Sequence, residues 1–167
     1  MKIDIIDYKE THREWARDLL EKHWGSAAVV SRGKLYQADI LSGFVAFIKG
    51  LPQGLVTYRI DGRECEIISL NSLMENRGIG TALIRAVLKA AVLTECHYVM
   101  VITTNDNERA QDFYRNRGFG LATVHKDAIQ ESRKLKPEIP EFGINGMPIK
   151  DEIEFRYIIR SDSNEDI

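Results

Sequence analysis

Alternating and helically spaced apolar residues divide the chain into a predicted series of strands and helices. Alternation, or short runs of β-branched and aromatic residues, predicts strands at 3–7, 44–48, 55–60, 63–73, 98–103, 119–125 and 151–159. Apolar positions at helical spacing predict helices at 11–23, at 82–91 and from about 107 until Gly118. Residues 27–41 fit no single pattern. We therefore expect one domain at 1–160, followed by a frayed acidic tail at 161–167.

Two connections indicate how neighbouring strands pair. Asp61-Gly62 is expected to form a two-residue hairpin turn, which makes the strands on either side of it antiparallel. The strand at 98–103 is continuously apolar, as is typical of a buried parallel strand, and a helix separates it from the strand before it. The sequence therefore predicts an α/β fold (α+β in character) with a central mixed, mostly antiparallel sheet flanked by helices.

The most informative stretch is the turn Glu75-Asn76-Arg77-Gly78-Ile79-Gly80-Thr81, which lies between a strand and an amphipathic helix. The start of a helix carries unpaired backbone N–H groups and a partial positive charge, and both favour phosphate. Glycines let the backbone approach a ligand closely. We interpret the turn as a binding site for pyrophosphate.

Three alternatives to this interpretation have to be weighed. An ordinary turn would also contain such glycines. A Walker loop requires Gly-Lys-Ser/Thr, whereas Thr81 and Ala82 follow Gly80. A dinucleotide-binding fingerprint requires a third glycine at the position of Leu83.

Composition narrows the class of protein. The chain has 167 residues, of which 44% are hydrophobic and 29% are charged, as in globular domains. A net charge of −2 argues against nucleic acid as a main partner. Cys65 and Cys96 lack a metal-type spacing, suit a reducing compartment and are expected in or near the core. Without a signal-peptide pattern or a membrane-length apolar run, the protein is expected to be cytoplasmic.

A second block downstream, Asn107-Glu108-Arg109-Ala110-Gln111-Asp112-Phe113-Tyr114-Arg115-Asn116-Arg117-Gly118-Phe119, points to a family. This block and the glycine turn together resemble the GNAT superfamily of N-acetyltransferases, over essentially the whole chain. The family patterns are Arg/Gln-x-x-Gly-x-Gly/Ala and Asn-x-x-Ala-x-x-Phe-Tyr-x-x-x-Gly-Phe. One position departs: Glu75 stands where the family has Arg or Gln, and Arg77 is expected to compensate its charge. The segments 133–140 and 151–154 look like an uncharacterised bacterial subgroup.

The resemblance implies acetyl-CoA as co-substrate and no metal. It places the pyrophosphate on backbone amides and the pantetheine arm and thioester carbonyl on the end of the preceding strand. The implied cofactor-binding residues are Leu70, Asn71, Ser72, Arg77, Gly78, Ile79, Gly80, Thr81 and Asn107. Asn107 would bond the pantetheine amides, and it could also, or instead, be a helix N-cap. Tyr114 occupies the family's general-acid position, with a core aromatic as the alternative.

The general base is left open. By alternation, Glu64 and Glu66 share one face of a strand with Ile68 and Leu70, so either carboxylate could deprotonate or anchor an amine. The alternatives are an exposed position on the strand and a water molecule as base. Glu152 and Glu154 on the last strand are further candidates for the base, although binding a cationic substrate is the favoured role for them. No catalytic role is assigned to His97 or His125.

The resemblance thus implies a cytoplasmic enzyme that transfers acetyl from acetyl-CoA directly to a primary amine of a small molecule or peptide. It implies neither nucleic acid nor membrane as a partner and is compatible with a homodimer. The rivals are a non-catalytic acyl-CoA-binding module and a nucleotide-dependent oxidoreductase. The long segment 126–150 contains a basic cluster of Arg133, Lys134 and Lys136. It is expected to be a loop that shapes the acceptor pocket, with a solvated loop as the alternative.

Overall fold

The computed structural model describes residues 1–159, and the predicted tail at 161–167 lies outside them. The strands are β1 (Asp4–Asp7), β2 (Ala28–Ser31), β3 (Lys34–Gln37), β4 (Ser42–Ile48), β5 (Leu51–Asp61), β6 (Glu64–Ser72), β7 (Tyr98–Thr104), β8 (Gly120–His125) and β9 (Glu152–Ile158). The helices are α1 (Arg13–Trp24), α2 (Ile79–Leu93), α3 (Glu108–Arg115) and α4 (Ala128–Leu135), with short 3₁₀ turns at Glu10–His12 and Ala38–Ile40.

Seven strands form one sheet in the order β1-β4-β5-β6-β7-β9-β8, and β2 and β3 form a separate hairpin. The neighbours β6 and β7 run parallel, whereas the other neighbouring pairs are antiparallel. This confirms the predicted mixed, mostly antiparallel sheet, and it resolves the ambiguous segment 27–41 as a hairpin that turns at Arg32 and Gly33.

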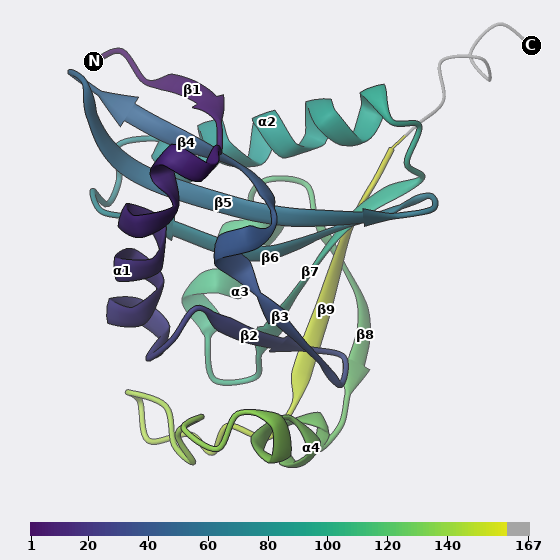
Figure 1. The fold of residues 1–167 in the computed structure, drawn as a ribbon. Helices are drawn as coiled ribbons and strands as arrows, with labels where there is room; N and C mark the ends of the chain where they lie inside the picture. Colours follow the sequence, from purple (N-terminus) through teal and green to yellow (C-terminus); the bar gives the residue numbers. More distant parts are fainter. Residues whose placement is uncertain (160–167) are drawn as a thin grey trace, which may run out of the picture.

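The two faces of the sheet bury different elements. On one face, the apolar stripe of α2 packs with α3 residues against β4, β5, β6, β7 and β9, in a core that includes both cysteines. On the other face, α1 and residues of β2 and β3 pack against β4, β5 and β6. Figure 1 shows α1 and the β2–β3 hairpin in front of the sheet and α2 and α3 behind it. The prediction of buried cysteines is confirmed for Cys65 and Cys96.

Two sequence predictions need correction. The hairpin turn before β6 consists of Gly62 and Arg63, because Asp61 pairs with Glu64 as part of the ladder. The segment 126–150 is not a plain loop, because it contains α4. Its basic cluster is largely engaged by the backbone: Arg133 donates to the carbonyls of residues 139, 140 and 149, and Lys136 donates to that of Ala28.

A bulge in β6 changes which residues share a face. Tyr58 pairs with Ile67 and Thr57 with Ser69, so Ile68 is an extra residue in the ladder. As a result, Ile68 packs with the α1 side of the sheet, whereas Leu70 packs with the α2 side. The expectation that Leu70 lies on the face of Glu64 and Glu66 is therefore wrong, because simple alternation does not count the inserted residue.

Candidate active site

The parallel strands β6 and β7 separate before they end. Their pairing stops at Ile67 and Val101, although β6 continues to Ser72 and β7 to Thr104. Figure 1 shows the two strands diverging beyond this point. Main-chain N–H and C=O groups on the facing edges thus lose their ladder partners, and they are available to a ligand that enters between the strands.

A pocket of about 500 Å³ opens at this separation, and we call it the cofactor groove. Its lining includes ten of the residues proposed from the sequence: Leu70, Asn71, Ser72, Arg77, Gly78, Ile79, Gly80, Thr81, Asn107 and Tyr114. The remaining two, Glu64 and Glu66, do not line it. The end of β6, the start of α2 and the helix α3 together form the walls, so the two sequence blocks meet in space.

The glycine turn has the geometry that phosphate binding requires. Gly78 has a φ of +79°, a left-handed conformation that favours glycine, and it is the N-cap of α2. The N–H groups of Ile79, Gly80 and Thr81 belong to the first turn of the helix, where they have no intrahelical acceptor. Gly80 also permits close packing, because a Cβ there would lie 2.9 Å from the ring of Phe113.

Two arginines at the groove were missed in the sequence. Arg117 donates to the hydroxyl of Thr81 at 2.9 Å, and its guanidinium lies 3.6 Å from the centroid of the Phe113 ring. Arg109 lies 2.9 Å from Glu75 across the groove, and this contact lowers the pKa of the Glu75 carboxyl. The charge of Glu75, the residue that differs from the family pattern, is therefore paired by Arg109, and not by Arg77 as expected.

Asn107 and Tyr114 both combine structural and ligand-facing features. The side-chain oxygen of Asn107 accepts from the N–H of Ala110 at 3.0 Å, so the N-cap alternative is correct, and the amide NH₂ is left for other partners. Tyr114 packs its ring edge-on against Phe113 and Phe119. Its hydroxyl makes no hydrogen bond to residues 1–159 and is not a fully buried unpaired atom, which agrees with the place of Tyr114 in the groove lining. Burial raises the pKa of Tyr114 well above its ordinary value. The phenol therefore stays protonated beside the groove.

The C-terminal end of α1 reaches the groove from the opposite face of the sheet. His23 lines the groove, and the indole N–H of Trp24 donates to the side-chain oxygen of Asn71 at 3.3 Å. Gly25, with a φ of +82°, ends the helix directly after these residues. The opening between β6 and β7 is thus reached from both faces of the sheet.

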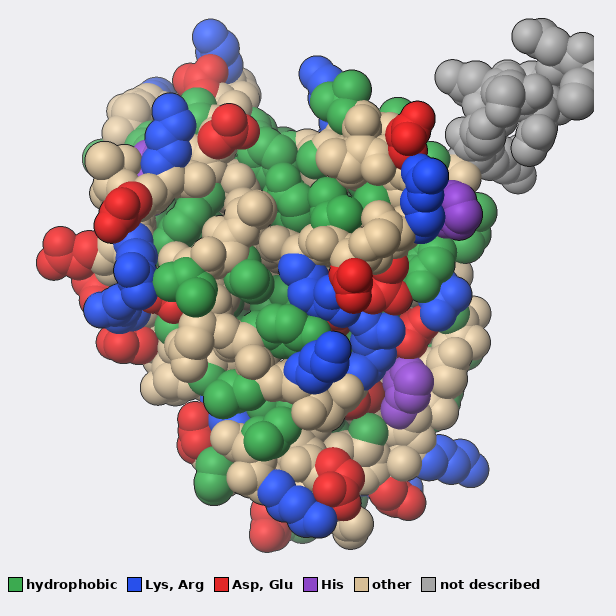
Figure 2. Space-filling view, turned by 45° about the vertical axis from the view of Figure 1, so that its right-hand side comes forward, with side chains coloured by type: hydrophobic (Ala, Val, Ile, Leu, Met, Phe, Trp, Pro, Cys, Tyr) green, Lys and Arg blue, Asp and Glu red, His purple; other side chains and the backbone are tan. Residues whose placement is uncertain are grey.

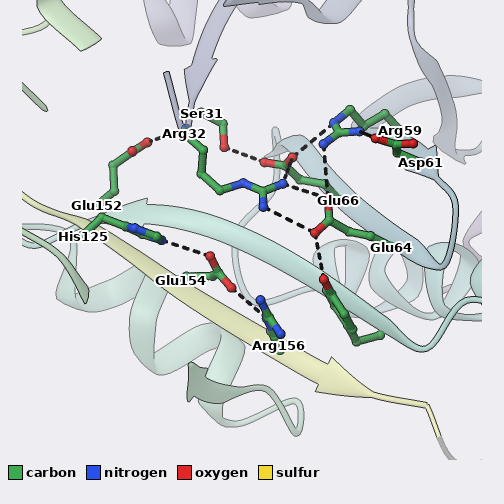
Figure 3. A network of polar contacts seen from close by, with 11 residues as sticks. Ser31, Arg32, Arg59, Asp61, Glu64, Glu66, His125, Glu152, Glu154 and Arg156 are labelled. Atoms are coloured by element: carbon green, nitrogen blue, oxygen red, sulfur yellow. Dashed lines mark hydrogen bonds and ion pairs between the residues drawn. The ribbon is translucent and has the colours of Figure 1, made fainter. Parts of the chain in front are cut away.

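Glu64 and Glu66 belong to a second polar cluster, which we call the polar face. It comprises Ser31, Arg32, Arg59, Glu64, Glu66, Tyr98, His125, Glu152, Glu154 and Arg156 (Figure 3). The register of the sheet places the members of β6, β7, β8 and β9 on the α1 side. Figure 2 shows basic and acidic side chains mixed in one patch of the surface.

Arginines hold the two glutamates of β6. Arg32 bonds both carboxylates, at 2.8 Å to Glu64 and 2.9 Å to Glu66, and Arg59 contacts both at 3.2 Å. Burial alone would raise the pKa of Glu64, but hydrogen bonds from Arg32 and Tyr98 lower it below its usual range. The lowered pKa makes the Glu64 carboxylate a weak proton acceptor, and the Glu66 carboxylate is occupied by both arginines and by the hydroxyl of Ser31. The geometry therefore argues against Glu64 and Glu66 as the general base.

The model of the acetyltransferase (GNAT) family matches residues 7–119 of this chain. The chain belongs to that family. It is 44% identical over 156 residues to the uncharacterised protein YdhI of Bacillus subtilis, covering 93% of this chain and 98% of that protein. It is 38% identical over 153 residues to the uncharacterised protein YxbD of Bacillus subtilis, covering 90% of this chain and 96% of that protein.

Solved structures of GNAT proteins share the fold. An IAA acetyltransferase from Bacillus cereus superposes with a TM-score of 0.72 at 19% identity, covering 95% of this chain and all of that one. An acetyltransferase from Bacillus subtilis in complex with CoA superposes with a TM-score of 0.68 at 14% identity, and this match also covers 95% of this chain and all of that one. These comparisons confirm the family and the fold that the two motifs predicted.

Residues 1–159 of this GNAT chain were also compared with the requirements for a membrane-spanning helix and for a metal site. None of its helices there combines the length and apolar character that crossing a bilayer requires. The same residues contain no group of three or more histidines, cysteines and carboxylates placed to hold a metal ion.

Proposed function

We propose that this GNAT protein is a cytoplasmic N-acetyltransferase that moves the acetyl group of acetyl-CoA directly to a primary amine. The observation that carries the proposal is the separation of β6 from β7 at the cofactor groove. The ligand-facing main chain of Leu70 to Ser72, the N-terminus of α2 and the phenol of Tyr114 all line one pocket of about 500 Å³. Pyrophosphate, thioester and leaving thiolate each have a chemically suited partner there.

Each part of acetyl-CoA has an assigned position in the groove. The N–H groups from Arg77 to Thr81 receive the pyrophosphate, and Arg117 adds positive charge beside it. The free edge of β6 bonds the pantetheine arm and polarises the thioester carbonyl, since its main-chain groups lack ladder partners toward β7. The amide NH₂ of Asn107 is free to bond a pantetheine carbonyl while its oxygen caps α3.

Direct transfer fits the nucleophiles of the chain. Cys65 and Cys96 are buried, and burial raises the pKa of the Cys65 thiol to about 12. A thiol with so high a pKa forms almost no thiolate at neutral pH, so it is unsuited to accept the acetyl group. The amine therefore attacks the thioester carbon itself, the C–S bond breaks, and the phenol of Tyr114 protonates the leaving sulfur.

A screen of primary amines that follows CoA thiol release tests this function. The panel should contain small amines, amino acids and peptides, with acetyl-CoA as donor. We expect release well above the rate of hydrolysis without amine for at least one class of acceptor. Tight acetyl-CoA binding without release for any amine would instead support the non-catalytic binding module, and stabilisation by NAD rather than acetyl-CoA would support the oxidoreductase.

A further inference from the structure

Glu152 differs from the other carboxylates of the polar face in its partners. Glu64 and Glu66 contact Arg32 and Arg59, and Glu154 contacts Arg156 at 2.7 Å. Glu152 has no cationic side chain within ion-pair distance in residues 1–159. One of its oxygens accepts only the backbone N–H of Arg32, at 3.3 Å, and the other accepts no hydrogen bond from these residues (Figure 3).

This incompletely paired carboxylate is also deeply placed, since Glu152 is 2% exposed. A buried carboxylate without a cation is costly, because it loses water without gaining an equivalent partner. Glu154, two residues along the same strand, has the same exposure but has both His125 and Arg156 beside it. The desolvation cost of a buried carboxylate is therefore left uncompensated at Glu152 but not at Glu154, and a positively charged ligand at Glu152 would offset it.

The sheet places Glu152 beside the opening between β6 and β7. Glu152 pairs across the ladder with Thr104, the last residue of β7, on the α1 side of the sheet. Thr104 and Ile102, which share that face, are only partly buried, so this end of β7 is not sealed by the β2–β3 hairpin. Glu152 does not itself line the cofactor groove, so an acceptor that enters from the α1 side would reach it by extending from the groove past the end of β7.

We propose that Glu152 receives the ammonium group of the acceptor and takes its proton before the nitrogen attacks the thioester. The proposal rests on the proposed acetyl transfer and assigns the acceptor class as a basic amine that is cationic in solution. The ammonium gives one proton to the carboxylate, the C–N bond forms and the C–S bond breaks. The sulfur takes the proton of Tyr114, and the second proton of the nitrogen restores the phenol as the amide forms. The carboxyl of Glu152 returns its proton to solvent.

The electrostatic surroundings agree with a proton acceptor. Burial raises the pKa of Glu152 toward the range useful for a base near neutral pH. The charged groups that act on it come from three other elements: Arg32 on the β2–β3 turn and His125 on β8 lower this pKa, whereas Glu66 on β6 raises it. Of the carboxylates discussed, Glu152 therefore combines a free oxygen with a pKa shifted in the required direction.

The test compares two acceptors in the Glu152→Gln variant. One acceptor is the best basic amine from the screen, and the other is its analogue with fluorines beside the amino group, which is neutral at the assay pH. The kcat/KM of the variant should fall on the order of 10²-fold for the basic amine, the lower end of acid–base contributions, and less than about threefold for the neutral one. Glu154→Gln, at equal depth in the same strand, should affect both acceptors equally.

The outcomes separate the two proposals. An equal loss for both acceptors in Glu152→Gln, or no loss for either, would overturn the role of Glu152, because a purely structural defect does not depend on the protonation of the acceptor. The glutamine side-chain oxygen can still accept the backbone N–H of Arg32, and a melting curve checks that the variant is folded. A wild-type protein that releases no CoA with any amine would instead contradict the proposed acetyl transfer.

Discussion

The cofactor groove and the polar face share strand β6 but are built in different ways. The groove uses backbone groups at the end of one strand and the start of one helix, and its lining residues, apart from His23, fall within 70–81 and 107–117. The polar face assembles side chains from β2, the β2–β3 turn, β5, β6, β7, β8 and β9. A backbone site can serve one fixed cofactor, whereas a side-chain site can change with the acceptor.

The charged side chains of the groove and of the polar face also differ in how deeply they are buried. The ion pair of Glu75 and Arg109 at the groove is exposed, with side-chain exposures of 66% and 73%. Glu66 and Glu154 on the polar face are almost fully buried. Exposed pairs contribute little to stability, whereas a buried carboxylate depends on its partner. Substitutions at the groove should therefore change ligand affinity, and substitutions on the polar face should change stability as well as acceptor use.

The largest effect is expected for Tyr114→Phe. Deleting the hydroxyl removes the proposed proton donor to the leaving thiolate, so kcat should fall on the order of 10²-fold. Affinity for acetyl-CoA, measured by calorimetry, should change little. Stability should stay within about 1 kcal/mol, because the ring packing is kept and the hydroxyl has no protein partner within residues 1–159.

The pH profile sharpens this prediction. Burial raises the pKa of Tyr114, so the wild-type rate should not decline from phenol ionisation at pH about 10, where an ordinary tyrosine ionises. The alkaline decline expected for an unperturbed phenol moves to higher pH. A Tyr114→Phe enzyme with the wild-type kcat would show that the phenol only packs in the core and that water protonates the sulfur.

The second effect concerns charge at the groove. Arg77→Glu places a negative side chain beside the pyrophosphate site, so the Kd for acetyl-CoA should rise at least about tenfold, or ~1.4 kcal/mol. Arg85→Glu makes the same charge change on an exposed position of α2 outside the groove, and its Kd should change less than about twofold. Equal effects in the two variants would indicate a general charge effect and contradict a local phosphate site.

The smallest effect compares one arginine from each region. Arg32→Gln leaves Arg59 as the one cation in contact with Glu64 and Glu66 among residues 1–159, and it should lower the free energy of unfolding by about 1 kcal/mol, since Arg32 is partly exposed. Arg109→Gln should leave the free energy of unfolding nearly unchanged, because the pair of Arg109 and Glu75 is exposed. Urea denaturation of both variants measures the difference, and equal losses would mean that burial does not distinguish the two regions.

The ion pair of Arg32 and Glu64 also predicts that stability depends on pH. The pKa of Glu64 is lower in the folded protein than in the unfolded chain, so its pairing stabilises the fold above the unfolded value of about 4.3. That contribution is lost as the pH falls through the folded pKa. The stability difference between wild type and Arg32→Gln should therefore be present at neutral pH and shrink in acid.

The sequence predicts the groove far better than the polar face, for a physical reason. Gly78, Asn107 and Tyr114 act through local geometry: a left-handed turn, a helix cap and a helical face, each encoded within a few residues. Even Glu75, the one residue that differs from the family pattern, pairs with Arg109 of the second sequence block. The parallel pairing of β6 and β7 also followed from the apolar run at 98–103 and from the helix that precedes it.

The failures arise where position depends on distant contacts or on an irregularity. The bulge at Ile68 moves Leu70 to the other face, and no residue at that point signals it. Glu64 and Glu66 are predicted as candidate bases, but the sequence does not reveal their pairing with Arg32, which lies in a hairpin with an ambiguous pattern. The sequence does not predict α4, because the length of the segment 126–150 and its three prolines, Pro137, Pro140 and Pro148, favour a loop.

The most direct measurement of the central claim is a balance of products by mass spectrometry. The protein is incubated with acetyl-CoA, first alone and then with the best amine of the screen. Direct transfer at the separation of β6 and β7 predicts no acetylated protein in the first step, and N-acetylated amine and free CoA in equal amounts in the second. Protein that carries acetyl on a side chain and passes it on when amine is added, or CoA release without acetylated amine, would contradict the account.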